Sequence, residues 1–355
     1  MSMKSVNPAT GQVLQEYPVL GDADLEAVLE RAVSTQKEIA ELSVGHRTEW
    51  LLQAADRLRA RREELAHLMT AEMGKTFASA LAEVDKCGWV CRYYAENGAS
   101  FLSDEVVESG ARASRVRYEP LGVVLAIMPW NFPLWQVFRF AAPALVAGNA
   151  GLLKHASNVP GCSLAIESVF AEAGFPPGAF QSLLIPAGRA EALVADHRIA
   201  AVTLTGSEPA GRAVARAAGQ SLKKSVLELG GSDPFIVLAD ADLEAAVETA
   251  VQARIINNGQ SCIAAKRFIV SEEIAEDFET RFIGRMEALK TGDPMDPSTD
   301  VGPLATGAIR AELHEQVTAS VAAGAHLSVG GVLPTGPGFF YPPTVLTDVP
   351  LRCPA

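Results

Sequence analysis

Apolar residues recur at intervals of three and four through the first hundred residues, which is the period of an amphipathic helix. Asp22 or Asp24 stands where an N-cap would open the first helix, because a short carboxylate can accept hydrogen bonds from the first turn. Gly74 is placed to end the second helix, since glycine tolerates the left-handed conformation of a helix terminus. The predicted helices cover residues 22–41, 44–73 and 76–98.

From Arg115 onward, short apolar runs alternate with helical segments. RVRYEP alternates like a strand, and LGVVLAIMPW is continuously apolar, as expected for a strand buried on both faces of a sheet. Strands alternating with helices of this length indicate βαβ units and a parallel sheet, so we predict an α/β fold. The predicted strands cover 115–120, 121–130, 150–154, 181–186 and 200–207, and the helices between them cover 135–147, 162–173, 189–197 and 208–219.

A second α/β segment begins after residue 224, where SVLELGGSDPFIVL occupies residues 225–238. We place the domain boundary at its two glycines. The predicted first domain is 1–228, a Rossmann-type parallel sheet with N-terminal helices, and the second is 229–355, also α/β.

Composition narrows the class of protein. The net charge is −12 and the basic residues are dispersed, apart from a cluster at 57–62 that we interpret as a solvated helix face, so nucleic acid is not an expected partner. No apolar leader segment and no run long enough for a membrane span is visible. The five cysteines are scattered, and Cys87 and Cys91 do not have a metal or redox spacing. We expect a reduced, cytoplasmic protein without a metal site.

Unusual residues cluster after the predicted strands. Trp130 and Asn131 follow the first buried strand, the turn 154–157 follows the second, and Gly206 and Ser207 follow the fourth. Ligands of open parallel sheets bind beyond the carboxyl ends of the strands, so these turns are the candidate binding site.

Two of these turns suggest a nucleotide. Gly206 opens TGSEPAG at a strand-to-helix turn, which is either a phosphate-binding turn or an ordinary αβ connection. Lys154 ends a buried strand, either extending its amine to solvent or offering a cation to a ribose or its phosphate. An acidic residue in this turn would repel a 2′-phosphate, whereas Ser157 would tolerate it, which favours NADP or dual use.

Three further residues carry possible chemistry. Asn131 is either a turn former or an amide donor to a developing oxyanion. Glu228 is either a structural carboxylate or a general base. Cys262 in NNGQSCIAAKR is either a small apolar filler or a nucleophile, which would require activation by a nearby cation or helix terminus.

Taken together, these residues form an ordered set of motifs: PWNFP at 129–133, LLK at 152–154, TGS at 205–207, LELGG at 227–231 and GQSC at 259–262. In this order and spacing they resemble the aldehyde dehydrogenase superfamily, from NPATG at 7–11 to YPPTV at 341–345. MPWNFPLWQV, ELGGSDPFIV and AAKRFIV are most similar to its NAD(P)-dependent succinate-semialdehyde dehydrogenase branch.

The resemblance implies roles for these residues. Cys262 would attack the aldehyde, Asn131 and the Cys262 N–H would hold the oxyanion, and Glu228 would activate the hydrolytic water. NAD or NADP, with NADP slightly favoured, would take the hydride. The matching cofactor-contact positions are Trp130, Asn131, Lys154, His155, Ala156, Ser157, Gly206, Ser207 and Leu229.

The branch also often has an arginine for the distal carboxylate of its substrate, and Arg139 occupies that place. Alternatively, Arg139 is a helix-surface arginine without a role in substrate binding. A second arginine of some relatives, six residues before the cysteine, is replaced by Ile256, with Arg254 nearby.

The chain stops after TVLTDVPLRCPA, where the family continues through a Glu-x-Phe-Gly-Pro segment. We therefore expect a C-terminally incomplete catalytic domain and weak or no turnover. Two alternatives stay open, namely a truncated paralogue that binds nucleotide or a subunit and an acylating thiol enzyme. The resemblance implies a small aldehyde as substrate and a homodimer or homotetramer for full-length members.

Overall fold

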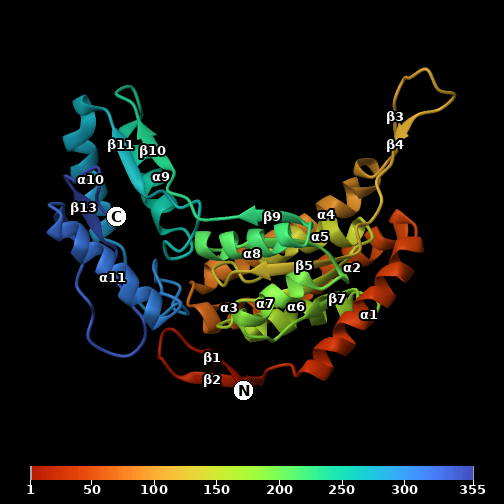
Figure 1. Ribbon diagram of the computed structural model, residues 1–355. Helices are drawn as coiled ribbons and strands as arrows, with labels where there is room; N and C mark the ends of the chain where they lie inside the picture. Colours follow the sequence, from red (N-terminus) through yellow and green to blue (C-terminus); the bar gives the residue numbers. More distant parts are fainter. Residues whose placement is uncertain (1, 355) are drawn as a thin grey trace. The chain divides into compact units, whose positions relative to one another are not determined.

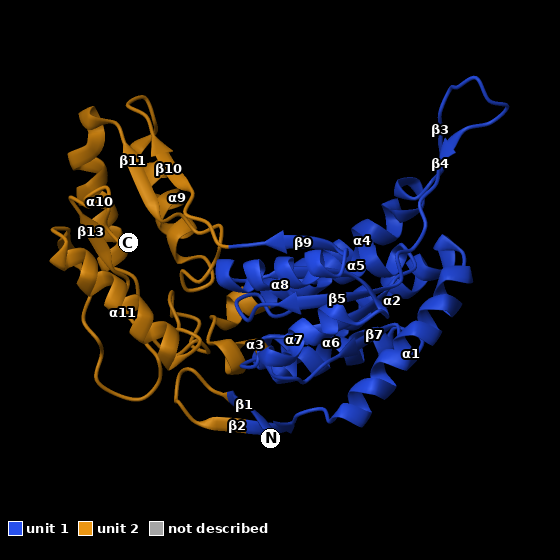
Figure 2. Cartoon of the chain, in the orientation of Figure 1, with its two compact units in different colours: residues 1–5, 15–68, 81–229 blue, residues 6–14, 69–80, 230–355 orange. Residues whose placement is uncertain are grey.

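A computed structural model of the chain describes residues 2–354, and these fall into two compact units (Figures 1 and 2). Unit 1 comprises residues 2–5, 15–68 and 81–229, and unit 2 comprises residues 6–14, 69–80 and 230–354. The chain passes from unit 1 to unit 2 for the last time at residues 229–230, after the strand that ends at Glu228. The division into a cofactor-binding and a catalytic domain is a functional one and stays a prediction.

Unit 1 is built on a five-stranded parallel sheet with the order β7-β6-β5-β8-β9, which confirms the predicted α/β fold. The chain starts at β5 in the middle, runs outward through β6 and β7, then returns to β8 and β9 on the other side. The strand order therefore reverses between β5 and β8, and this is where doubly wound sheets bind their ligands. The strands are β5 (Val123–Met128), β6 (Ala150–His155), β7 (Phe180–Ser182), β8 (Ile199–Thr205) and β9 (Lys224–Glu228).

Helices cover both faces of this sheet (Figure 1). Val123 and Leu125 of β5 point into a core that also contains residues of α1, α7 and α8, whereas α5 and α6 contact strands β5, β6 and β7. Because successive strand residues face opposite sides, burial on both faces explains the continuous apolar runs of β5 and β6. The helices are α1 (Asp22–Glu41), α2 (Val44–Ala60), α3 (Arg62–Met73), α4 (Phe77–Phe101), α5 (Trp135–Val146), α6 (Pro160–Glu172), α7 (Ala190–Ala195) and α8 (Glu208–Gln220).

Several predicted elements differ in the structure. The N-cap of α1 is Gly21, without a side-chain hydrogen bond, so neither Asp22 nor Asp24 caps it. The predicted strand 115–120 is reduced to β4 (Arg115–Val116), which pairs with β3 (Glu105–Val106) outside the main sheet. Strands β1 (Ser2–Val6) and β2 (Val13–Pro18) pair with each other and were not predicted.

The predicted helix 44–73 is broken at Arg61. The Arg61 guanidinium donates to Glu172 (2.8 Å) and Ser168 (2.7 Å) of α6 and to Glu64 (2.7 Å), and only 19% of its side chain is exposed. The interpretation of the cluster 57–62 as a solvated helix face is therefore wrong for Arg61. A long-range ion pair, which the local sequence does not reveal, stabilises the break between α2 and α3.

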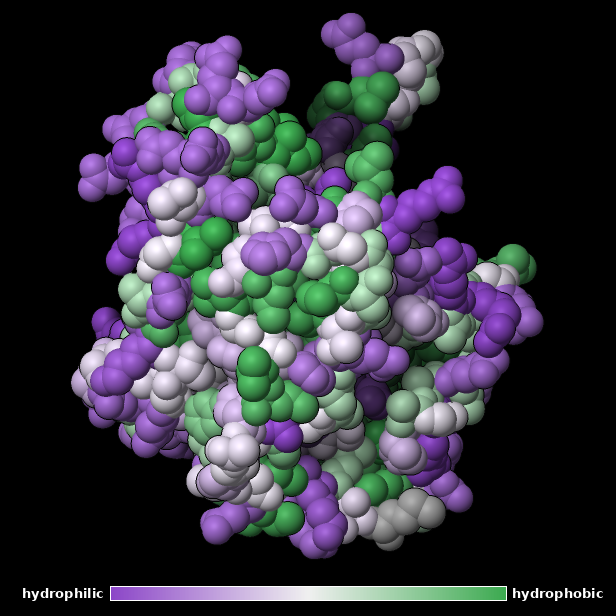
Figure 3. All heavy atoms as spheres, turned by 90° about the vertical axis from the view of Figure 1, so that its left-hand side faces the viewer, coloured by the Kyte–Doolittle hydropathy of each residue, from purple (hydrophilic) through white to green (hydrophobic). Residues whose placement is uncertain are grey.

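Unit 2 contains a parallel strand pair joined by a helix. One face of the pair packs Phe235, Val237 and Phe268 against α9 and α10, while Ile236 and Ile269 on the other face are more than half exposed. Figure 3 shows one face of the molecule, on which apolar side chains form patches among polar ones. The elements are β10 (Pro234–Val237), α9 (Leu243–Ile255), β11 (Arg267–Val270), α10 (Ala275–Glu287), α11 (Gly307–Ala322), and the antiparallel pair β12 (His326–Val329) and β13 (Val345–Thr347).

None of the helices between residues 2 and 354 combines the length and apolarity that a bilayer span requires.

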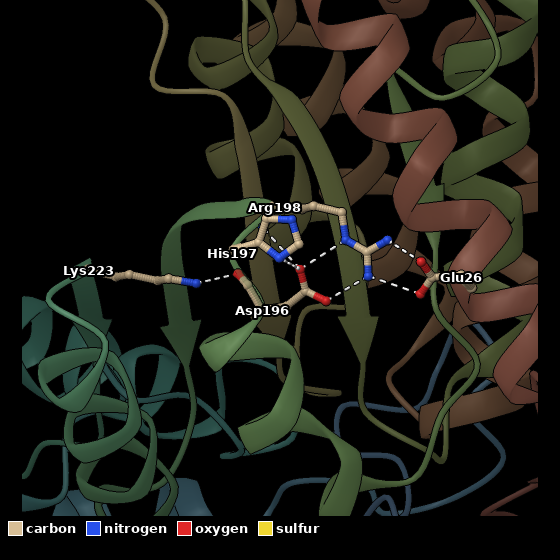
Figure 4. Close-up of polar contacts among 5 residues, drawn as sticks. All are labelled: Glu26, Asp196, His197, Arg198 and Lys223. Atoms are coloured by element: carbon tan, nitrogen blue, oxygen red, sulfur yellow. Dashed lines mark hydrogen bonds and ion pairs between the residues drawn. The ribbon is translucent and has the colours of Figure 1, made fainter.

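An ion-pair cluster fastens α1 to the start of β8 (Figure 4). Arg198 donates to Asp196 (2.7 Å) and to Glu26 of α1 (2.6 Å), and Lys223 donates to the Asp196 carbonyl. The side chains of Arg198 and Asp196 are only 16% and 17% exposed. The hydrogen bonds from Arg198 lower the pKa of Asp196 to about 2. The pair therefore links two elements that are distant in sequence.

We predict that Arg198→Ala lowers the free energy of unfolding by about 1–2 kcal/mol, because it leaves the mostly buried Asp196 carboxylate without its partner. The matched control is Arg212→Ala, which removes an exposed pair with Glu208 and is expected to cost less than about 0.5 kcal/mol. Urea denaturation of both variants measures the difference, and equal losses would contradict the prediction.

Candidate functional site

The parallel register of unit 1 brings the carboxyl ends of four strands to one edge of the sheet. Ile127 of β5 pairs with Lys154 of β6 and with Leu204 of β8, and Thr205 of β8 pairs with Glu228 of β9. The predicted residues that end or follow these strands therefore share this edge: Trp130, Asn131, Lys154, His155, Ala156, Ser157, Gly206, Ser207, Glu228 and Leu229.

Lys154 lies in the sheet, and only 7% of the residue's surface is exposed. Burial lowers the pKa of its amine. No hydrogen bond or ion pair within residues 2–354 offsets this effect on the Lys154 pKa. A buried lysine is rarely left without a partner, because removing an ammonium from water is costly. The arrangement suits an anionic or hydroxyl-bearing ligand.

The turn after β6 offers a second donor beside Lys154. Ser157 is exposed, and the Nδ2 of Asn158 is buried without a partner in the described part of the chain. The sequence interpretation missed Asn158, although an amide in a strand-to-helix turn was an available signal. No carboxylate occupies positions 154–158.

The turn after β8 begins helix α8. Ser207 is the N-cap of α8, and its hydroxyl accepts from the Ala210 N–H at 3.5 Å. Gly206 does not have a left-handed φ, and a Cβ on it would meet only Leu204 at ordinary contact distance (3.6 Å). Neither the backbone nor the packing therefore requires glycine at position 206, so a ligand that approaches the backbone closely is a sufficient reason for it.

Leu229 packs against the same helix. A Cβ on Gly211 would lie 2.6 Å from Leu229 Cδ2, so the glycine in the first turn of α8 makes room for this leucine. Its side chain also contacts the unit 1 core. Leu229 therefore continues the apolar surface of the sheet to its edge.

The segment after β5 carries Asn131. The Asn131 Oδ1 accepts from the Phe132 N–H (3.1 Å), which leaves the amide nitrogen as the end that donates. The Nε2 of His155 lies 2.9 Å from the Pro133 carbonyl, and Glu83 of α4 accepts from the N–H groups of Leu134 and Trp135. Glu83 was not predicted, since nothing local marks an acid on α4 as the partner of a distant turn.

Arg139 of α5 reaches the same edge. Its Nη2 lies 3.4 Å from the Thr205 hydroxyl and 4.0 Å from the Glu228 carboxylate. The side chains of Arg139 and Glu228 are 39% and 57% exposed, so this ion pair contributes little stability and both groups are open to solvent. A guanidinium and a carboxylate are thus available at the edge where β8 and β9 end.

Cys262 belongs to unit 2, where it lies in the loop between α9 and β11. Asn257 and Asn258 both have left-handed φ angles (57° and 56°), which is unusual for residues other than glycine. The Asn258 side chain donates to the carbonyls of Gly74 (2.8 Å) and Pro303 (3.2 Å). These bonds hold the strained start of the cysteine loop in place.

Two cations fix the rest of this loop. Arg254 donates to the carbonyls of Gly259 and Ala265 at the two ends of the loop, and burial lowers its pKa. Its guanidinium is thus used inside unit 2. Lys266 donates to the carbonyls of Cys262 (3.1 Å) and Gly231 (2.8 Å). Cys262 is half-buried, whereas Cys87, Cys91 and Cys162 are buried and burial raises the pKa of Cys91.

The profile of the aldehyde dehydrogenase family matches residues 1–354. The chain belongs to this family. Its chemistry is the NAD(P)-dependent oxidation of an aldehyde, which confirms the predicted enzyme class.

Family relatives align over nearly the entire chain. A probable succinate-semialdehyde dehydrogenase [NADP(+)] of Synechocystis sp. is 56% identical over 354 residues, which are 100% of this chain and 78% of the relative. Succinate-semialdehyde dehydrogenase [NADP(+)] 1 of Mycobacterium tuberculosis is 54% identical over 352 residues, covering 98% of this chain and 77% of the relative. The resemblance to this branch is thereby confirmed.

Solved structures of the family have the same fold. Succinic semialdehyde dehydrogenase from Streptococcus pyogenes, in complex with NADP⁺, superposes with a TM-score of 0.97 at 36% identity, covering 99% of this chain and 78% of that one. Lactaldehyde dehydrogenase from Escherichia coli superposes with a TM-score of 0.95 at 33% identity, covering 99% and 75%. The sheet edge described above is thus part of an aldehyde dehydrogenase fold.

We predict that His155 makes this aldehyde dehydrogenase less stable in mild acid. Burial lowers the pKa of His155 to about 4, with a smaller contribution from the charge of Lys154. An unfolded histidine binds its proton near pH 6.5, whereas the folded one remains neutral until about pH 4. Its contribution is therefore complete above pH ~6.5, and the free energy of unfolding falls by up to about 3 kcal/mol as the pH drops towards 4.

Urea denaturation of the chain and of His155→Gln between about pH 7 and pH 4.5 measures this dependence. In the variant, the free energy of unfolding is expected to fall less steeply as the pH drops, because the contribution of His155 is gone. Asp196, with a pKa of about 2, titrates below this window. Equal slopes in both proteins would refute the assignment.

Proposed function

We propose that the enzyme oxidises succinate semialdehyde to succinate with NADP⁺, using Cys262 as nucleophile, Asn131 as oxyanion donor and Glu228 as general base. The observation that carries the substrate assignment is the accessible Arg139 guanidinium beside Glu228, 4.0 Å from its carboxylate. The names of the relatives at 54–56% identity support the same substrate class.

The fit of NADP rests on the turn after β6. Next to Ser157 lie the buried Lys154 and the Asn158 amide, whose Nδ2 is buried without a partner in the described part of the chain. None of the five residues 154–158 is an acid that would repel a 2′-phosphate. Gly206 would let the pyrophosphate approach the N-terminus of α8, whose N–H groups would donate to it. When bound, NADP⁺ accepts the hydride.

The protein supplies the remaining steps. The Cys262 thiolate forms a C–S bond to the aldehyde carbon, and the Asn131 amide with the Cys262 N–H stabilises the oxyanion of the thiohemiacetal. Loss of hydride leaves a thioester on Cys262. Glu228 removes a proton from the water that attacks this thioester, which releases the carboxylate and restores the thiol. Overall, aldehyde, NADP⁺ and water give carboxylate, NADPH and two protons.

The remaining assignments follow from the same evidence. We place Trp130 and Leu229 at the rim of the cofactor site, since both border the turns described above. A cytoplasmic location and a homodimer or homotetramer are proposed by analogy with the family.

We predict that Cys262→Ala lowers the kcat for NADPH formation with succinate semialdehyde by at least about 10³-fold relative to the unmodified chain, because no other group replaces the nucleophile. Cys353→Ala is the matched control, since Cys353 is the other half-buried thiol among residues 2–354 and should leave kcat unchanged. Product analysis by mass spectrometry separates the alternatives. With a thiol acceptor added to the assay, an acyl-thioester product would indicate an acylating enzyme. NADP binding without turnover would indicate a nucleotide-binding paralogue.

We also predict that Arg139→Met lowers kcat/KM for succinate semialdehyde by about 10- to 100-fold, the value of a hydrogen bond to a charged group. Butanal, which has the same chain length without the carboxylate, is the control substrate and should lose little. An equal fall for both aldehydes would place the effect of Arg139 at Glu228 and contradict its role as the carboxylate ligand.

A further inference from the structure

Two prolines reduce the number of backbone donors in the segment between β5 and α5. Pro129 and Pro133 lack an N–H, and the Phe132 N–H is already bonded to the side chain of Asn131. The Pro133 carbonyl therefore becomes an important attachment point for this segment. It lies 2.9 Å from the Nε2 of His155, a residue that is only 4% exposed.

The surroundings of His155 decide its tautomer. The Ala156 N–H donates to Nδ1 at 2.9 Å, so Nδ1 is an acceptor and the single hydrogen of the neutral ring is on Nε2. That hydrogen is donated to the Pro133 carbonyl. The Met128 carbonyl lies 3.2 Å from Nδ1, but a hydrogen on Nδ1 would face the Ala156 N–H and leave two acceptors opposed at Nε2.

His155 thus bridges two adjacent turns of the sheet edge. It ends β6, pairs with Met128 in the strand register and reaches across to the carbonyl two residues after Asn131. Glu83 fixes the following backbone from α4, by accepting from Leu134 and Trp135 (2.9 Å each). A bond from β6 and two bonds from α4 therefore hold the backbone that follows Asn131.

The His155 ring is buried and both of its nitrogens are bonded to backbone groups, so the predicted cofactor contact at this position does not involve the imidazole. We propose that His155 is a positioning residue for the oxyanion donor Asn131, acting through the hydrogen bond from its Nε2 to Pro133. This inference rests on the proposed function of Asn131. A misplacement of about 1 Å can cost up to about 10²-fold in rate, so the bond affects kcat even though His155 is not in contact with the substrate. KM for the aldehyde is not expected to follow, because Asn131 acts on the charge that develops in the reaction.

Two variants separate the donated bond from mere occupancy of the site. In His155→Gln, the side-chain Nε2 can reach the place of the histidine Nε2 and donate to Pro133. In His155→Asn, the shorter amide reaches only the place of Nδ1. We expect His155→Gln to stay within about fivefold of the original kcat and His155→Asn to lose about 10- to 100-fold. Similar losses in both variants would overturn the proposed bond.

A double-mutant cycle tests whether the effect passes through Asn131. His155→Asn is introduced into the chain and into the Asn131→Ala variant, and kcat is normalised to the folded fraction from urea denaturation. If His155 positions Asn131, its replacement has almost no further effect once the amide is gone. Equal fold-losses in both backgrounds would mean that His155 has only a general structural role and would refute the proposal.

Spectroscopy tests the positioning without enzyme activity. The four tryptophans, Trp50, Trp89, Trp130 and Trp135, can be labelled with 5-fluorotryptophan and assigned by single replacement. We expect the Trp130 resonance to shift or broaden in His155→Asn and to match the original in His155→Gln, with Trp50 and Trp89 unchanged as internal references. An unchanged Trp130 resonance in His155→Asn would refute the proposal.

The two proposals fail separately. Absence of turnover in the unmodified chain contradicts the proposed function, and the fluorine spectra still decide the role of His155. Turnover that depends on Cys262, with equal losses in the cycle, contradicts only the role of His155.

Discussion

The parallel register of β5 with its two neighbours is the constraint on which the site depends. Pairing Met128 with His155 and Ile127 with Leu204 makes the strands end together, so the turns that follow them meet at one edge. A slip by one residue would turn every side chain of a strand to the opposite face. It would also move His155 away from Pro133. Because both faces of β5 are apolar and buried, side-chain packing against the helices on each face, and not an alternation of polar and apolar residues, holds this register and thereby the site.

Strong hydrophobic patterns made much of the fold predictable. The apolar runs of β5 and β6 are long enough to be recognised alone, and strand–helix alternation implies a parallel sheet. Elements held by distant contacts were not predictable. The helix break at Arg61 is stabilised by Glu172 and Ser168, which lie more than a hundred residues away. The short strands β1 and β2 have too few residues for a periodicity to stand out.

In the candidate site, too, local sequence patterns were predictable and distant contacts were not. Motifs identified the residues at strand ends, because glycine, lysine and asparagine are conspicuous there. They did not reveal which side chains support them. Glu83 is an acid within a helix, and only the fold brings it to the N–H groups of Leu134 and Trp135. Arg254 lies near the place of the second substrate arginine of some relatives. Its guanidinium, however, donates to carbonyls of the cysteine loop within unit 2.

The buried imidazole of His155 also affects how the site can be redesigned. Histidine usually introduces a charge change near neutrality, which complicates the comparison of variants at different pH. Here burial lowers the pKa of His155 to about 4, so the ring stays neutral in weakly acidic, neutral and alkaline solution. The Asn131 turn therefore has the same electrostatic support throughout that range. An engineer who changes charges elsewhere in the site can vary pH without altering this support.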